Sequence, residues 1–176
     1  MTPLMKAAKL ETLNISENLV ETVPSLKACT ILADLDLSGN WLMDLTGLTE
    51  APALTDLNVS ACELIDPDME TLAGIAPLRK LDISYNNMED ISALFALKEL
   101  ETLDITGTPV DLADYADLPL SVDYVDADIV KSGDSSDGLK WMIDKDGRLI
   151  IYGKGKMRSY EDAETPWPDA DRKSVV

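Results

Sequence analysis

A short apolar pattern recurs through the first 130 residues at a nearly constant interval. The pattern is L-x-x-L-x-L, in which valine or isoleucine can replace leucine, and its copies begin at residues 10, 32, 54, 78 and 100. Successive starts are therefore 22, 22, 24 and 22 residues apart, and a degenerate sixth copy begins at Val122. A fixed period of this length predicts a solenoid, in which each repeat forms one coil that stacks on the next.

A polar or small side chain follows the last apolar position of each copy by three residues. These residues are Asn18, Asn40, Cys62, Asn86 and Thr108. A buried amide at this position can bond backbone groups of the turn in its own coil and in the next coil, so we expect a ladder of such side chains. Cys62 is interpreted as a ladder residue and Cys29 as a small apolar residue of a returning arc, rather than as redox groups.

The 24-residue copy places its two extra residues within IDPDMETLAG. Asp66 before Pro67 is typical of the cap and first turn of a short helix, which we expect on the convex side. The 22-residue period with a short returning arc resembles the leucine-rich repeats of bacterial internalins and of regulatory subunits of protein phosphatase. The resemblance implies an α/β fold over residues 1–130, a right-handed solenoid of about six coils with a parallel sheet on its concave side.

A different pattern begins after Gly133. Apolar residues alternate with polar ones on either side of DKDGR, which predicts a β-hairpin whose Gly147 supplies the positive φ of the turn. Asp144 and Asp146 also match the start of a calcium loop, but the remaining ligands of such a loop are missing, so the sequence favours the turn.

This segment resembles the small β module that precedes the leucine-rich arrays of BspA-like surface proteins. The matching residues are Trp141, Asp146, Gly147, Leu149, Ile151, Gly153, Gly155, Met157, Pro166, Trp167, Lys173, Val175 and Val176. The resemblance implies a module over residues 131–176 that is truncated at its C-terminal end. It also implies a place at the bacterial cell surface, in adhesion or host contact. Since MTPLMKAAK aligns with ISALFALKE, we expect the chain to start inside a repeat, as a fragment of a longer protein.

The charge is strongly acidic and unevenly distributed. The net charge is -18, and counting along the sequence gives 6 Lys+Arg and 24 Asp+Glu in residues 1–130 against 9 and 9 in residues 131–176. An acidic surface repels phosphates and anionic lipid, so it disfavours nucleic acid and favours a basic protein or cations as partner. No apolar run has the length that a membrane span requires, and the start of the chain lacks the apolar core of a signal peptide.

The residue types needed for most enzyme chemistry are missing. The chain has no histidine, which removes Ser-His and Cys-His pairs and the commonest metal ligand. No glycine-rich phosphate loop joins a strand to a helix. Carboxylate pairs are plentiful, but a solvated strand face has no apolar pocket to keep one acid protonated. We therefore expect no enzyme activity, no cofactor and no metal ligand set.

Strand alternation directs the residues between the leucines to the concave face, where stacked coils form columns. The first predicted column is Thr12, Asp34, Asp56, Lys80, Thr102 and Tyr124. The second is Asn14, Asp36, Asn58, Asp82, Asp104 and Asp126, and the third is Ser16, Ser38, Ser60, Ser84, Thr106 and Asp128. Carboxylates about 5 Å apart in a column repel by about 1 to 3 kcal/mol. A cation, a basic partner or the hydroxyl column can offset this cost.

The acidic column has two interpretations. In the first, L-D-L-S is a common form of this repeat, in which Asp and Ser are solvated and bond to each other. In the second, the acids receive a basic segment of a partner protein, with aromatic anchors beside them. We predict a monomeric, non-catalytic binding module whose partner-binding residues are Asp34, Asp36, Trp41, Asp56, Lys80, Asp82, Tyr85, Thr102, Asp104, Tyr124 and Asp126. The alternatives are a passive spacer and an intracellular regulatory subunit that binds an enzyme.

Overall fold

The computed structural model describes residues 7–115, 118–119, 122–134 and 138–153. Contacts divide the chain into two compact units. The first consists of Met1–Val110 with Val122–Val125, and the second of Asp111–Ser121 with Asp126–Val176. The first unit carries the repeats and the second carries the hairpin. The sequence-based division at residue 130 stays a prediction.

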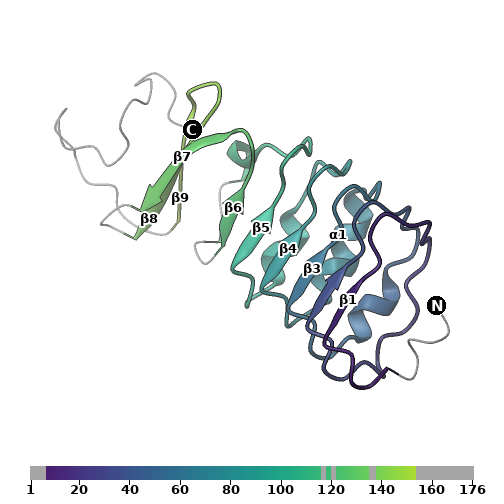
Figure 1. Ribbon diagram of the computed structural model, residues 1–176. Coiled ribbons are helices and arrows are strands. Elements are labelled where there is room, and N and C mark those ends of the chain that lie inside the picture. Colours follow the sequence, from purple (N-terminus) through teal and green to yellow (C-terminus); the bar gives the residue numbers. More distant parts are fainter. Residues whose placement is uncertain (1–6, 116–117, 120–121, 135–137, 154–176) are drawn as a thin grey trace. The chain divides into compact units, whose positions relative to one another are not determined.

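The first unit contains a parallel sheet to which each repeat contributes one strand (Figure 1). The strands are β1 (Thr12–Asn14), β2 (Asp34–Asp36), β3 (Asp56–Asn58), β4 (Lys80–Asp82), β5 (Thr102–Asp104) and β6 (Asp123–Val125). They lie side by side in chain order. One short strand per repeat, each hydrogen-bonded to the next, is the arrangement of a leucine-rich repeat solenoid, as the period predicts.

The leucines of the repeat form the core of the first unit. Leu32, Leu54 and Leu78, which open three of the copies, are fully buried. The returning arcs lie behind the sheet, opposite the face that the strands present to solvent (Figure 1). They contain the short 3-10 helices η2 (Thr46–Glu50) and η3 (Ser92–Ala96) and the helix α1 (Asp66–Ala73). Helix α1 lies in the segment that holds the two extra residues, and it contacts both η2 and η3.

The predicted helix is present, but Asp66 does not cap it. The N-cap is Ile65 and Asp66 is the first helical residue. The carboxylate of Asp68 accepts a hydrogen bond from the Ile65 N–H at 2.9 Å. The Asp66 carboxylate instead accepts hydrogen bonds from the backbone N–H groups of Glu89 and Asp90, at 2.7 and 3.0 Å, and so links its coil to the following one.

The polar ladder is present and is buried in the middle of the array. Asn40 Nδ2 donates to Leu37 O at 2.7 Å in its own coil and to Ile15 O at 3.0 Å in the preceding coil. Cys62 occupies the same position, and its thiol donates to Leu37 O at 3.2 Å. The bonds between coils therefore run to the preceding coil, and the expectation of bonds to the next coil was wrong.

The sixth strand pairs in a register that differs by one residue from the predicted frame. Leu103 pairs with Tyr124 and Asp104 with Val125. Because side chains alternate along a strand, a slip of one residue exchanges the two faces. Tyr124 therefore takes the inward position that the frame assigned to Val125. The sixth copy has no leucines, so the larger apolar surface of the tyrosine ring decides which residue is turned inward.

The second unit is built on an antiparallel three-stranded sheet. Its strands are β7 (Ile129–Asp134), β8 (Leu139–Asp144) and β9 (Leu149–Gly153), in that order. The predicted hairpin is confirmed, because β8 and β9 pair across a turn in which Gly147 has a φ of 78°. Strand β7 was not predicted. The later residues of the BspA-like match, from Gly155 to Val176, and the N-terminal alignment of residues 1–6 lie outside the described residues.

Alternating apolar residues of the hairpin pack together, as their spacing predicts. Trp141, Ile143 and Leu149 form a buried cluster, and Ile151 packs against it. Within the described part of the chain, no helix has the length and apolar character needed to cross a membrane.

Candidate partner-binding surface

The concave face consists of the strand residues of β1 to β6 whose side chains point away from the leucine core. Strand pairing places Asp34, Asp56, Lys80 and Thr102 in one column and Asp36, Asn58, Asp82 and Asp104 in the next. The first two predicted columns are thus confirmed for the first five coils. The sixth coil differs, because Asp123 follows Thr102 and Val125 follows Asp104.

The shifted register removes two predicted residues from this surface. Tyr124 pairs with Leu103 and is half-buried, so it belongs to the inward-facing series. Asp126 lies after the end of β6, where its carboxylate accepts a hydrogen bond from the Asp128 N–H at 3.1 Å. The expected acidic run therefore ends at Asp104, and an exposed valine lies beside that residue.

Each carboxylate of the second column is anchored by the turn of its own coil. One oxygen of Asp82, Oδ1, accepts from the Ser84 N–H at 2.9 Å and from the Ser84 hydroxyl at 2.6 Å. Asp36 makes the same two bonds with Ser38, and Asp104 accepts from the Thr106 N–H at 2.9 Å. These bonds hold each carboxylate against its own turn and offset part of the repulsion between neighbouring coils. The Asp–Ser bonds that the first interpretation assumes are therefore present, and the second interpretation stays a prediction.

The second oxygen of these carboxylates differs from coil to coil. Asp36 Oδ2 accepts a hydrogen bond from Asn14 Nδ2 at 2.8 Å. Among the residues that the structure describes, Oδ2 of Asp82 and Oδ2 of Asp104 accept no hydrogen bond from the protein. Within the described part of the chain, two adjacent coils thus present carboxylate oxygens that have no donor.

The concave face is hollowed around these two carboxylates. The hollow is lined by Asp34, Asp56, Leu57, Asn58, Lys80, Leu81, Asp82, Thr102, Asp104 and Val125. Its one lysine already has a partner, since Lys80 Nζ lies 3.1 Å from Asp56 Oδ1. The lining therefore carries a net negative charge. Its exposed apolar member, Val125, was not predicted as a site residue, because the frame of the sixth copy assigned it to the inward-facing series.

Two predicted anchors, Trp41 and Tyr85, are exposed but do not line the hollow. Tyr85 has a φ of 54°, and a Cβ added to Gly107 would lie 2.7 Å from Cδ1 of the tyrosine ring. The ring is therefore packed on the glycine backbone of the next coil and is held in place. The structure brings the predicted acids together, but it does not bring the aromatics to them.

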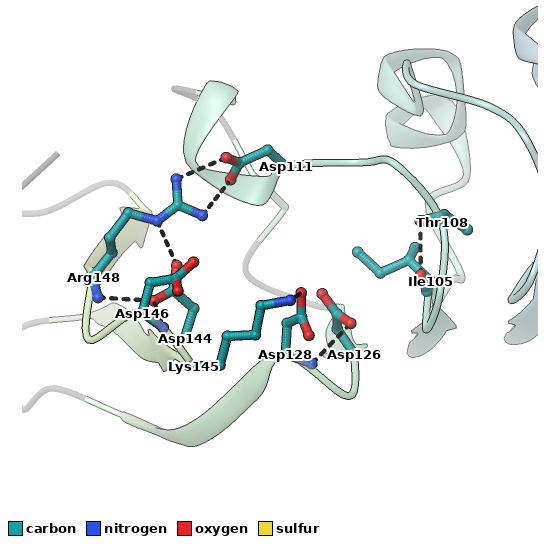
Figure 2. A network of polar contacts seen from close by, with 9 residues as sticks. All are labelled: Ile105, Thr108, Asp111, Asp126, Asp128, Asp144, Lys145, Asp146 and Arg148. Atoms are coloured by element: carbon teal, nitrogen blue, oxygen red, sulfur yellow. Dashed lines mark hydrogen bonds and ion pairs between the residues drawn. The ribbon is translucent and has the colours of Figure 1, made fainter.

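Two basic residues of the second unit, Arg148 and Lys145, pair with acids of the same unit (Figure 2). Arg148 bonds two carboxylates, with Nη1 at 2.7 Å from Asp111 Oδ2 and Nε at 2.5 Å from Asp144 Oδ2. Lys145 Nζ lies 2.6 Å from Asp128 Oδ2. The hydrogen bond from Arg148 lowers the pKa of Asp111, and the hydrogen bond that Lys145 donates to Asp128 raises the pKa of Lys145. This network closes the hairpin turn.

The Asp144 carboxylate organises that turn. Its Oδ1 accepts hydrogen bonds from the Asp146 N–H at 3.0 Å and from the Arg148 N–H at 2.8 Å. These contacts support the turn rather than a calcium loop. In the described segments, no three His, Cys, Asp or Glu side chains lie close enough to hold a metal ion.

The two cysteines are buried free thiols. Burial raises the pKa of the Cys62 thiol, and its hydrogen bonds to carbonyl groups are those of a ladder residue. A thiol with a raised pKa is a poor nucleophile at neutral pH. The structural interpretation of Cys62 therefore agrees with its surroundings.

Comparison with known proteins supports the repeat. Residues 52–110 match the family model described as leucine rich repeat. A leucine-rich repeat-containing protein 56 of Homo sapiens is 37% identical over 81 residues, which cover 46% of this chain and 15% of that protein. A leucine-rich repeat-containing protein 43 of Mus musculus is 30% identical over 122 residues, which cover 64% of this chain and 18% of that protein. The matches thus span less than a fifth of either relative.

A solved structure shares the fold. The crystal structure of an internalin from Listeria monocytogenes superposes with a TM-score of 0.57 at 24% sequence identity, covering 69% of this chain and 36% of the internalin. Similarity at this level establishes the fold, and the function has to be argued from the residues of the surface. The array of β1 to β6 is therefore a leucine-rich repeat solenoid.

Proposed function

We propose that this chain is a non-catalytic protein-interaction module that binds a basic segment of a partner protein on its concave face. The observation that carries the proposal is the hollow around Asp82 and Asp104, whose outward oxygens have no protein donor among the described residues. Leucine-rich repeat proteins generally bind other proteins, and the repeat match supports that role.

The chemistry of the hollow favours a lysine-rich or arginine-rich segment over other ligands. Phosphates would meet the four carboxylates of Asp34, Asp56, Asp82 and Asp104, and like charges repel. A lysine or arginine side chain can place its methylene stem on an apolar surface while its charged head reaches a carboxylate. The exposed side chain of Val125, beside Asp104, provides such an apolar surface here.

The proposal is tested by removing the two outward carboxylates and measuring the binding of a decalysine peptide by fluorescence anisotropy. Asparagine is the appropriate replacement, because Asn14 and Asn58 make the same turn bonds in their own coils. We expect the double variant Asp82→Asn/Asp104→Asn to weaken binding about tenfold at low salt. The salt dependence of binding should also become shallower.

The matched control removes the same charge elsewhere. Glu70, on α1, and Glu99 are exposed acids outside the concave columns. The variant Glu70→Gln/Glu99→Gln should bind within about twofold of the wild-type protein. Equal weakening in both double variants would mean that the peptide responds to net charge alone, and the proposed site would be rejected. A protein that binds no basic peptide would instead fit a passive spacer.

We also propose a bacterial cell-surface setting, which rests on the BspA-like resemblance of the hairpin. The described part of that resemblance consists of a tryptophan strand, an Asp-Gly turn and an L-x-I strand, and it forms β8 and β9. The coding sequence around this chain tests the setting. An export signal in the same reading frame is expected, whereas an intracellular regulatory subunit would have none.

A further inference from the structure

Four large apolar side chains are exposed where the chain turns away from the sheet. Leu19, Met43, Trp41 and Ile65 expose 94%, 72%, 65% and 51% of their surfaces, respectively. We call these four residues the apolar turn patch. All of them follow a strand by several residues, in the first three coils.

The stacking of coils brings the members of the patch together. Leu19 and Trp41 occupy equivalent positions 22 residues apart, as do Met43 and Ile65. The first two coils are tied at this turn, because the Met43 N–H donates to Glu21 O at 2.7 Å and the Val20 N–H donates to Asn40 Oδ1 at 2.9 Å. Equivalent positions in neighbouring coils of a solenoid lie about 5 Å apart, close enough for side chains to touch.

Trp41 and Met43 connect the two halves of the patch. They flank Leu42, which is buried, whereas their own side chains are exposed. An indole and a thioether exposed in one turn are the kinds of side chain that are enriched at the centres of protein interfaces.

The fold does not require apolar residues at these positions. Other coils fill the position of Leu19 and Trp41 with Glu63 and Asn87. They fill the position of Met43 and Ile65 with Glu21 and Glu89. Exposed apolar clusters are uncommon on monomeric surfaces and are typical of binding sites. Their restriction to three adjacent coils indicates a local function rather than a property of the repeat.

The residues around the patch are acidic. Glu17, Glu21, Asp44, Glu63 and Asp66 are all exposed in the same turns. Two of these acids are held in place, since Asp44 Oδ1 accepts from the Thr46 hydroxyl at 2.7 Å and Glu63 Oε2 accepts from Asn87 Nδ2 at 2.9 Å. The bond from Thr46 also lowers the pKa of Asp44. A second copy of this chain would bring like charges to such a rim, whereas a basic partner would complement it.

We propose that the apolar turn patch is a second docking surface, which binds a partner segment carrying apolar anchor side chains flanked by lysine or arginine. The anchors cover Trp41 and Met43, and the basic residues pair with the acidic rim. This surface differs from the concave hollow in that binding gains affinity from buried apolar area as well as from charge. Binding at the apolar turn patch does not depend on binding at the concave hollow.

Selection from a library of short random peptides displayed on phage tests the proposal with the full chain. A first selection uses the wild-type protein, and a parallel one uses the double variant Trp41→Ser/Met43→Ser. We expect the wild-type protein to enrich peptides that combine aromatic or aliphatic residues with lysine or arginine, and the variant to enrich none of them. A synthetic copy of the most enriched peptide should bind the variant about tenfold more weakly than the wild-type protein.

Two controls make the outcome specific. The single variant Ile31→Ser removes an exposed apolar side chain outside the patch and should leave the affinity within about twofold of the wild-type value. The variant Asp82→Asn/Asp104→Asn should do the same, which separates this surface from the concave hollow. The proposal is overturned if no such peptides are enriched, if the enriched peptides lack basic residues, or if the patch variant binds them unchanged. The serine variants replace exposed residues and the asparagine variant replaces half-buried ones, so circular dichroism checks that each remains folded.

Discussion

Asn86 illustrates how a single side chain joins two coils. Its Nδ2 donates to Ile83 O and to Val59 O, both at 2.9 Å, and its Oδ1 accepts from the N–H groups of Cys62 and Leu64 at 2.9 and 3.0 Å. The side chain is buried, so water cannot replace these bonds. The ladder position therefore satisfies backbone groups that would otherwise be buried without partners.

Replacing Asn86 with alanine should consequently destabilise the solenoid. We expect Asn86→Ala to lower the free energy of unfolding by about 2 to 4 kcal/mol, because two backbone N–H groups and two carbonyl groups lose their partner. Urea denaturation followed by circular dichroism measures the loss.

Asn18 is the matched control for this prediction. It occupies the same position in the first coil, but it is exposed, and among the described residues its amide bonds only the carbonyl groups of Ile15 and Ser16. The variant Asn18→Ala should cost about 1 kcal/mol or less. Equal losses in the two variants would show that bonds between coils contribute nothing beyond those within a coil.

At the scale of elements, the hairpin depends on one arginine. Arg148 joins the start of η4 (Leu112–Asp114) to the β8–β9 turn, since Asp111 is the N-cap of η4 and Asp144 ends β8. Figure 2 shows the guanidinium between these two carboxylates. Segments that are distant in the sequence are thus connected by charge-assisted hydrogen bonds within the second unit.

This connection should respond to acid. The Arg148 bond lowers the pKa of Asp111 from its usual value of 3.8, so the folded state binds a proton less readily than the unfolded state does. The contribution to stability is present above pH 3.8 and is lost as the pH falls through the lowered pKa. We expect Arg148→Met to reduce the stability of the second unit by about 1 kcal/mol at neutral pH and to flatten its decline in acid.

The measurement for Arg148→Met is the NMR indole signal of Trp141, which is buried in the hairpin core, followed during urea denaturation at several pH values. Lys145→Met is the control, because Lys145 pairs with Asp128 and does not contact Asp111. Lys145→Met should leave unchanged the loss of stability that the second unit shows as Asp111 is protonated. If the stability of the second unit falls with pH in the same way in the wild-type protein and in Arg148→Met, the role given to this ion pair is contradicted.

At the scale of the whole molecule, the excess of negative charge lowers the stability of the folded state. Residues 1–130 hold 24 acidic and 6 basic residues, and the concave face gathers several of the acids in adjacent coils. A compact state with this imbalance is destabilised by self-repulsion. Salt screens that repulsion, because the Debye length falls from about 30 Å at 0.01 M to about 3 Å at 1 M.

Thermal unfolding should therefore depend on salt. We expect the melting temperature to rise by a few degrees between low and high sodium chloride concentration, and to rise less in Asp82→Asn/Asp104→Asn. Calorimetry at a series of salt concentrations measures how steeply the melting temperature rises with salt in the wild-type protein and in the variant. Glu70→Gln/Glu99→Gln removes the same net charge, so an equal reduction in that variant would assign the effect to total charge rather than to the concave face.

Much of the fold could be predicted from sequence because it depends on local pattern. The period sets one strand per coil, the alternation around Leu35 and Leu57 sets which residues face the core, and Gly147 permits the hairpin turn. These features follow from side-chain periodicity and backbone sterics, which act over a few residues. The first two columns of the concave face could be predicted as far as Asp104 for the same reason.

The remainder depended on contacts between distant residues. Whether Tyr124 or Val125 turned inward in β6 was decided by packing against the fifth coil, and that choice removed Asp126 from the acidic column. The exposure of Met43 was also decided by the fold, since composition alone would assign it to the core. The sequence by itself determined the repeat and its charge, whereas the tertiary structure decided register and exposure, because these two properties are settled by competition among side chains for the same buried space.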